Sequence, residues 1–171
     1  MRRKIKVKRS IKPDSRNGSV KVAKFLNYIM LDGKKSVAQR VVYNSFDYLK
    51  EKHKLEPMDT FEEALKNVGP HTELRSRRVG GANYQIPHEV TPRRRTTLAM
   101  KWIIEAARAK SGQPMHMRLA EEIVAASKNE GEAIKRRDNV LKMAEANRAF
   151  AHFARSSSRS PSQSQSQSQS Q

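Results

Sequence analysis

The sequence predicts a mainly α-helical domain: a six-helix, bundle-like body with one projecting two-stranded β-ribbon between the third and fourth helices. Three observations lead to this fold class. Apolar residues recur at helical spacing in six segments, Gly and Pro separate those segments, and one stretch alternates apolar and polar residues as strands do. A chain of 171 residues is long enough to bury one core.

The first two helices are expected on either side of an Asp32-Gly33 turn. The first follows Ser19, and Ser36 is the expected N-cap of the second, because a serine side chain accepts hydrogen bonds from free first-turn N–H groups. Each segment has one apolar face, as a helix packed on a core requires. The residues expected to face inward are Val22, Phe25, Leu26, Ile29 and Met30 in the first helix and Ala38, Val42, Ser45, Phe46 and Leu49 in the second.

The third helix is expected to begin after Pro57 and to end at Gly69-Pro70. Thr60 and Glu63 stand three residues apart, which is the spacing of a capping box. The residues expected to form its apolar stripe are Phe61, Ala64, Leu65 and Val68.

Three more helices are expected after residue 90. Thr91-Pro92 opens the fourth as an N-cap and first-turn pair, and Gly112 closes it. The fifth opens near Pro114, and the sixth runs from about Glu132 into the early 150s. The residues expected to face inward are Leu98, Ala99, Trp102, Ile103 and Ala106 in the fourth, Met117, Ala120, Ile123 and Val124 in the fifth, and Ala133, Val140, Ala144, Asn147 and Ala151 in the sixth.

The ribbon is expected over residues 72–90. In its second half apolar and polar residues alternate from Tyr84 to Val90, whereas residues 72–79 have β-character but alternate poorly. Gly80–Asn83 is expected to reverse the chain. Because two strands alone are only marginally stable, the base of the ribbon is expected to pack on the helices while its tip projects.

Composition divides the chain into three regions. Residues 1–12 hold seven basic residues and no acidic one, and form a basic N-terminal arm. Residues 13–155 are expected to form the helical domain, with 27 basic and 17 acidic residues. Residues 156–171 are almost entirely Ser and Gln, so they bury too little apolar area to offset the entropy of folding and are expected to be disordered.

The charge balance predicts a polyanionic partner. The net charge of +18 attracts nucleic acid or an anionic membrane and repels a second copy of the chain, so no homo-oligomer is expected. No apolar run approaches the length of a membrane span, and no membrane partner is expected. The absence of cysteine excludes disulfides and thiolate metal sites and permits residence in a reducing cytosol.

Arginine is concentrated around the ribbon. Arg75, Arg77 and Arg78 lie on its first strand, and Arg93–Arg95 opens the fourth helix, with few acidic residues nearby. Cationic residues in the first turn oppose the helix macrodipole, so their presence favours an external anion such as phosphate. The alternative is a solvated cationic face.

Two smaller basic clusters are weaker indications of RNA contact. Lys34-Lys35 lies in the turn between the first two helices. The sixth helix has several acidic residues that could pair with its basic ones, which makes a solvated face a stronger alternative there. Its basic residues and histidine are Lys135, Arg136, Arg137, Lys142, Arg148, His152 and Arg155.

Catalysis finds little support in the sequence. The five histidines are dispersed, with no pair at metal-ligand spacing on one helix. The adjacent carboxylates Glu62-Glu63 and Glu121-Glu122 diverge on a helix and are interpreted as first-turn charges. No catalytic residue, metal site or cofactor is therefore expected, and an enzyme is the third-ranked function.

Aromatic residues make up only 6% of the chain, which favours recognition of RNA by its phosphates, shape and sugar hydroxyls. A helix-turn-helix regulator that binds DNA or messenger RNA is the second-ranked alternative.

Several longer motifs resemble the bacterial form of the small-subunit ribosomal protein seven family. They run through about residues 2–155 in the order and spacing of that family: Asp32–Ser36, Ser76–Gly81, Tyr84–Pro87, Arg94-Arg95, Leu98–Ile103 and Met143–His152. The Ser/Gln tail after Arg155 departs from the family pattern.

The resemblance implies a cytoplasmic protein of the ribosome that binds the 3′ major domain of small-subunit ribosomal RNA and starts assembly of the subunit head. It also implies exit-site transfer RNA, the messenger RNA path and small-subunit protein eleven as neighbours. The residues expected to contact ribosomal RNA are Arg2, Arg3, Lys4, Lys6, Lys8, Arg9, Lys12, Lys34, Lys35, Arg75, Arg77, Arg78, Arg93, Arg94, Arg95, Arg118, Arg136, Arg137 and Lys142. Those expected near transfer or messenger RNA are Gly80, Gly81, Asn83, Tyr84, Asn147, Arg148 and His152.

Overall fold

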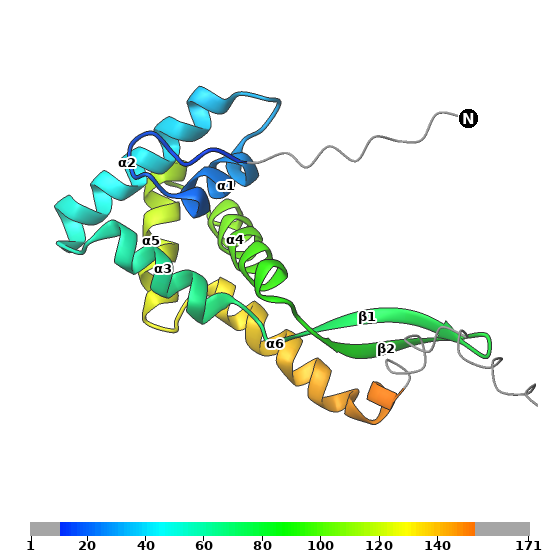
Figure 1. Ribbon diagram of the computed structural model, residues 1–171. Coiled ribbons are helices and arrows are strands. Elements are labelled where there is room, and N and C mark those ends of the chain that lie inside the picture. Colours follow the sequence, from blue (N-terminus) through cyan, green and yellow to red (C-terminus); the bar gives the residue numbers. More distant parts are fainter. Residues whose placement is uncertain (1–10, 153–171) are drawn as a thin grey trace, which may run out of the picture.

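The computed structural model describes residues 11–152, which form six α-helices and one β-hairpin in the predicted order. The helices make a body from which the hairpin extends (Figure 1). The elements are α1 (Val20–Ile29), α2 (Lys35–His53), α3 (Pro57–Val68), β1 (Thr72–Val79), β2 (Ala82–Glu89), α4 (Pro92–Ala109), α5 (Met115–Ser127), α6 (Glu132–Ala146) and a 3-10 turn η1 (Arg148–Ala151). The predicted fold class is confirmed. Most of the basic arm and the Ser/Gln tail lie outside the described residues.

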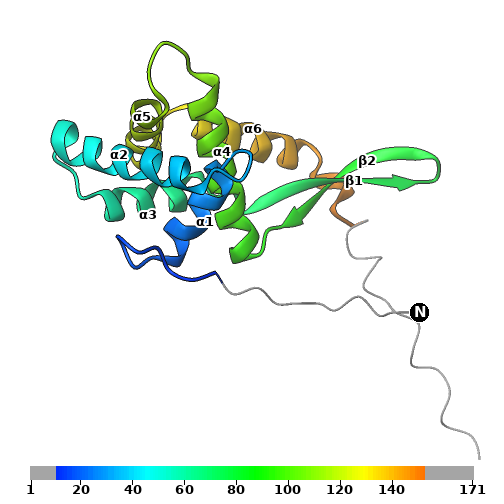
Figure 2. The same ribbon diagram turned by 90° about the horizontal axis from the view of Figure 1, so that it is seen from above.

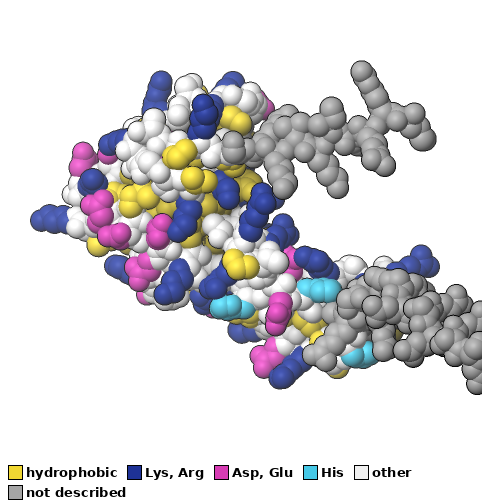
Figure 3. Space-filling view, viewed as in Figure 1, with side chains coloured by type: hydrophobic (Ala, Val, Ile, Leu, Met, Phe, Trp, Pro, Cys, Tyr) yellow, Lys and Arg dark blue, Asp and Glu magenta, His cyan; other side chains and the backbone are white. Residues whose placement is uncertain are grey.

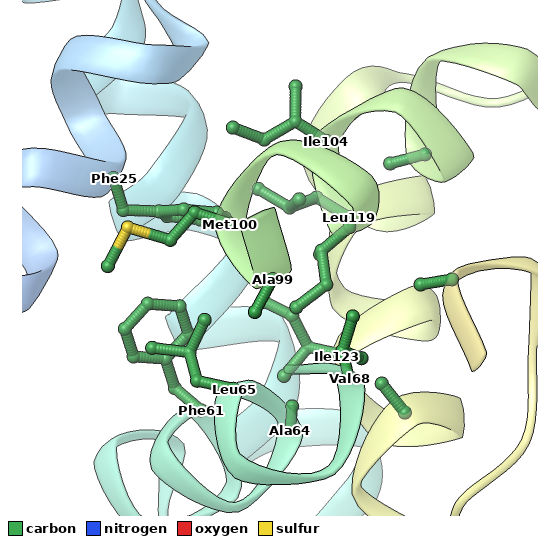
Figure 4. Close-up of a cluster of buried hydrophobic side chains, with 14 of the residues drawn as sticks. Phe25, Phe61, Ala64, Leu65, Val68, Ala99, Met100, Ile104, Leu119 and Ile123 are labelled. Atoms are coloured by element: carbon green, nitrogen blue, oxygen red, sulfur yellow. The ribbon is translucent and has the colours of Figure 1, made fainter. Parts of the chain in front are cut away.

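The core forms where α1, α2, α3, α4 and α5 meet. The rings of Phe25 and Phe46 lie 5.0 and 5.9 Å from that of Phe61, and Met100 and Ile123 are fully buried around them (Figure 4). Each such side chain contributes roughly 1.5–3 kcal/mol when it leaves water. The predicted apolar faces of α1 to α4 are buried, apart from a partly buried Met30. On α5 the prediction was wrong at one position, because Leu119 is fully buried and Met117 only partly.

The helix starts agree in part with the sequence. The predicted start of α1 after Ser19 is confirmed, and the Ser19 hydroxyl caps the helix by accepting a hydrogen bond from the Val22 N–H. The predicted caps at Ser36 and Thr60 are wrong. Helix α2 already begins at Lys35, which places Ser36 inside its first turn. Helix α3 begins at Pro57, and the Thr60 hydroxyl donates to the Glu56 carbonyl, four residues back along the helix.

The hairpin is braced from its base as far as Tyr84, and its tip projects (Figures 1 and 2). A two-residue turn, Gly80-Gly81, joins the strands with φ of 56° and 91°, values that suit glycine at both positions of a tight hairpin turn. Both views show α6 running beside the hairpin (Figures 1 and 2), and the ring of Tyr84 lies 5.0 Å from that of Phe150 in η1. The sixth helix ends at Ala146, sooner than predicted, and η1 supports the ribbon beyond its base.

Candidate nucleic-acid interface

A buried carboxylate joins the ribbon to the start of α4. Glu73 on β1 has a side chain only 11% exposed, and its Oε1 accepts hydrogen bonds from Arg75 at 2.5 and 2.8 Å. Its Oε2 accepts one from Arg94 Nε at 3.1 Å. The two arginine side chains are themselves about half exposed, at 59% and 48%. One acid therefore holds two guanidinium groups from different elements at the surface.

The pKa of Glu73 reflects this arrangement. Burial is the largest single influence and raises the pKa, but the hydrogen bonds and positive charges of Arg75 and Arg94 together outweigh it and leave the pKa lower than usual. The carboxylate therefore stays ionised, and the pair of arginines stays in place, throughout the neutral range.

The three arginines that open α4 have different surroundings. Arg95 lies against the end of α3, where its Nε donates to the Gly69 carbonyl at 2.9 Å and its Nη2 to the Lys66 carbonyl at 3.0 Å. Arg94 pairs with Glu73. Arg93 is exposed, and its side chain has no hydrogen bond or ion pair with any of residues 11–152. Only part of this predicted anion site therefore faces outward.

Glycine at position 69 makes the inward arginine possible. A Cβ there would lie 2.7 Å from Arg95 Cγ, closer than real Cβ contacts come, and 3.1 Å from the Leu65 carbonyl oxygen, which is a tight contact. The glycine that ends α3 thus also makes room for the side chain that caps it.

The outer half of the ribbon presents the remaining arginines. Arg77 and Arg78 are exposed and stand opposite Tyr84 and Asn83 in the strand register. Gly80 and Gly81 are also exposed, and Tyr84 is half-buried against Phe150. The predicted tip residues therefore lie together at the end of a braced arm (Figure 2).

The basic residues of α6 have more partners. Lys135 pairs with Glu132 at 2.6 Å, and Arg136 pairs with Glu105 and lies over the Trp102 ring. Arg137 is 21% exposed, and its Nη1 donates to the Asn67 carbonyl of α3 at 2.7 Å. Lys142 is exposed. The alternative of a locally neutralised face is stronger here than around the ribbon.

The C-terminal residues predicted near transfer RNA follow α6. The Asn147 side chain donates to the Met143 carbonyl at 2.7 Å, His152 Nδ1 lies 2.8 Å from the Ala149 carbonyl, and Arg148 is exposed. These residues lie at the end of the helix that flanks the ribbon (Figure 1), so the structure brings the two predicted groups into one region.

Lys34, Lys35 and Arg118 form a separate group at the other end of α4. Lys34 and Lys35 are exposed at the start of α2, and Arg118 donates to the Lys110 carbonyl. Since α4 has 18 residues, about 27 Å of helix separates this group from the ribbon base. In Figure 3 dark blue side chains extend over the region of α4 between the two ends. Lys12 is exposed, and Arg2, Arg3, Lys4, Lys6, Lys8 and Arg9 lie outside the described residues.

Sequence reasoning missed two polar residues that hold the body together. Glu122 lies in the middle of α5, not in a first turn, and is fully buried. Its carboxylate pairs with Lys110 at 2.7 Å and accepts the Ala133 N–H at the start of α6. The Asn67 side chain donates to the Ala126 and Ser127 carbonyls. The signal for Glu122 was its position three residues after Leu119 and four before Ala126, on the apolar face.

No helix of residues 11–152 is long and apolar enough to cross a membrane. In the same part of the chain, no group of three or more His, Asp or Glu side chains is arranged to hold a metal ion.

Comparison with known proteins identifies the family. The model of the family described as Ribosomal protein S7p/S5e matches residues 1–148. The small ribosomal subunit protein uS7 of Thermotoga maritima is 56% identical over 153 residues, which cover 90% of this chain and 99% of the relative. The uS7 proteins of Teredinibacter turnerae and Polynucleobacter asymbioticus are 51% and 53% identical over 152 residues, 89% of this chain and 97% of each relative. The chain therefore belongs to the S7p/S5e family of ribosomal proteins, and it is a structural protein of the small ribosomal subunit in the cytoplasm and not an enzyme.

Proposed function

We propose that this protein binds the 3′ major domain of small-subunit ribosomal RNA and starts assembly of the subunit head. The observation that carries the proposal is the surface at the ribbon base, where Glu73 holds Arg75 and Arg94 and where Arg93 is exposed beside them. Guanidinium groups that are fixed in advance lose less conformational entropy when they bind phosphate, and their planar donors match its oxygens.

The proposed contacts extend beyond this surface. They include the exposed Arg77, Arg78, Lys34 and Lys35, and the basic arm of residues 1–12. Clusters on both ends of α4 suit a folded RNA that touches the body at several separate places. Arg95 and Arg137, which hold the end of α3, support the interface by keeping the helices in position.

The end of the arm is the part that we assign to exit-site transfer RNA and the messenger RNA path. Gly80 and Gly81 leave the turn without side chains, so a nucleic-acid backbone can approach closely. Asn147, Arg148 and His152 follow α6 on the same side, and small-subunit protein eleven is the expected protein neighbour there.

A footprint tests the ribosomal RNA site. The full chain is mixed with the isolated 3′ major domain RNA at moderate salt, with transfer RNA as competitor, and the protected nucleotides are mapped. We expect discrete protection at a junction of RNA helices that the competitor does not remove. Diffuse protection that disappears with the competitor would contradict the proposal and favour a general polycation or a regulator of another RNA.

A pair of double variants then tests the ribbon. Replacing both Arg77 and Arg78 with alanine should lower the slope of log affinity against log salt by about 1.4–1.8, since each lost phosphate contact removes about 0.7–0.9. Lys50 and Lys52, exposed on α2 at the far side of the body, provide a control of equal charge. Equal slopes for the two double variants would show that the ribbon contributes only net charge.

A further inference from the structure

A cavity of about 470 Å³ lies at the end of α4 opposite the ribbon. Four helix ends surround it: the C-termini of α1 and α4 and the N-termini of α2 and α5. Its volume falls in the range of about 300–1,000 Å³ that small-molecule sites occupy. The cavity is therefore large enough for one small ligand.

The walls of the cavity are largely apolar. Ile29, Val41 and Met115 line it from three different helices. At its mouth Leu31 is 61% exposed and Val37 is 50% exposed, although both are large aliphatic residues. Exposed apolar residues around a concave site are typical of a surface that binds an apolar group.

Two arginines are fixed at the edge of this cavity. Arg108 Nη2 donates to the Ile29 carbonyl at 3.1 Å, and Arg118 Nη1 donates to the Lys110 carbonyl. A guanidinium group has five N–H donors, so each of these arginines keeps further donors that can bind a ligand. Lys34 adds an exposed ammonium group on the same wall. The edge can thus hold an anion such as phosphate.

One acidic residue distinguishes this site from a simple phosphate patch. Asp32 also lines the cavity, is exposed, and has a left-handed backbone with φ of 50°. A carboxylate repels phosphate and accepts hydrogen bonds only. The ligand that satisfies all three features has an anionic part, an apolar part and hydrogen-bond donors, as a nucleotide has.

We propose that the cavity binds one unstacked nucleotide of the ribosomal RNA. The base lies on the apolar walls, the phosphate contacts Lys34 and Arg118, and Asp32 accepts a hydrogen bond from an exocyclic amino group or a ribose 2′-hydroxyl. Unpaired bases that leave the stack are the usual targets of sequence-specific RNA recognition. This inference rests on the proposed function and adds a specific feature of the RNA to it.

The test fills the mouth of the cavity. Val37→Trp places a large ring there, and because Val37 is half exposed the fold should tolerate it. Val20→Trp, at an exposed valine on α1 that does not line the cavity, is the matched control. We expect Val37→Trp to weaken binding to the 3′ major domain RNA about tenfold and to make one unpaired nucleotide reactive to base-specific probes, while Val20→Trp resembles the unchanged protein.

A second measurement uses Asp32→Asn. If the cavity takes a nucleoside, loss of the acceptor charge weakens binding; if it takes only a phosphate, loss of the repulsion strengthens binding and overturns the proposal. Replacing the newly reactive nucleotide by an abasic one should weaken binding of the unchanged chain about tenfold and change binding of Val37→Trp little.

The outcomes distinguish a failure of the proposed function from a failure of the nucleotide site alone. If the unchanged chain gives no discrete footprint, the proposed function fails. If the footprint is discrete but Val37→Trp leaves it intact, only the nucleotide site fails. A Val37→Trp chain that binds the isolated RNA normally but blocks a later protein from joining the subunit would assign the cavity to a protein neighbour and contradict the inference.

Discussion

Two basic triplets, Arg93–Arg95 at the start of α4 and Lys135–Arg137 in α6, look alike in sequence but differ in the structure. Each has one arginine that faces inward, and both of these reach the end of α3, Arg95 through the Lys66 and Gly69 carbonyls and Arg137 through the Asn67 carbonyl. The other members differ. In α6 they pair with exposed acids, whereas in α4 one is held by a buried acid and one has no partner among residues 11–152.

The comparison teaches that the number of arginines overstates the binding surface. Helix-end carbonyls need donors, and a long cationic side chain can supply them while its charge interacts well with the helix C-terminus. An arginine in this protein therefore either holds the body or is available to RNA. Stability and RNA binding of matched variants distinguish these two roles.

The largest effect on stability is expected for Arg95→Ala. It removes the donors of two carbonyls at the end of α3, so the free energy of unfolding should fall by about 2–3 kcal/mol. Urea denaturation measures the change. Arg93→Ala, two residues earlier and exposed, is the control and should change stability by no more than about 0.5 kcal/mol. Equal losses for both variants would remove the distinction between inward and outward arginines.

A smaller loss is expected for Arg137→Ala, because it frees one carbonyl and breaks a pair with the half-exposed Asp138. The free energy of unfolding should fall by about 1–2 kcal/mol in the same denaturation experiment. Lys135→Ala, which breaks only an exposed pair with Glu132, should cost about 0.5 kcal/mol or less. If Lys135→Ala proved the more damaging, surface pairing would matter more in α6 than the link to α3.

Glu73→Gln tests, through RNA binding, whether Glu73 positions Arg75 and Arg94. It removes a negative charge from a surface that binds a polyanion, so electrostatics alone would raise affinity. If Glu73 positions Arg75 and Arg94, affinity for the 3′ major domain RNA should instead fall about tenfold, while affinity for unrelated RNA rises slightly. Glu89→Gln, at an exposed acid on β2, is the control and should raise both affinities slightly. A rise in specific affinity with Glu73→Gln would contradict the positioning role.

The smallest effect concerns pH. Because the pKa of Glu73 is lower in the folded protein, its ion pairs contribute to stability above the pKa of the unfolded chain, about 4.3, and the contribution is lost as pH falls through the lower folded pKa. The difference in unfolding free energy between the unchanged chain and Glu73→Gln should therefore be constant from pH 6 to 8 and shrink below about pH 4. A difference independent of pH would show that the carboxylate charge is not involved.

Much of the fold could be predicted because periodicity and helix breakers are local signals. The segment from Pro57 to Gly69 and the Thr91-Pro92 start lie where the sequence placed them. The caps at Ser36 and Thr60 were wrong because a hydroxyl near a helix start can also lie within the first turns and bond backward. The end of α6 was missed because the turn at Asn147 interrupts a pattern that otherwise continues.

The sequence predicted which residue types form the site but not how their side chains are arranged. The sequence shows that arginines are in excess around the ribbon, yet not that Arg95 faces α3 or that Glu73 is buried between two arginines, because these depend on how distant elements pack. The cavity beside Lys34 has the same origin, since its walls come from four helices that are separate in the chain.

The central claim is that the outward arginines at the start of α4 bind RNA and that the residues of α6 paired with exposed acids do not. The most direct measurement is the salt dependence of binding to the 3′ major domain RNA for Arg93→Ala and Lys135→Ala, two variants that remove the same charge. The account predicts that the slope falls by about 0.7–0.9 for Arg93→Ala and is unchanged for Lys135→Ala. Equal slopes, or a larger change for Lys135→Ala, would contradict it.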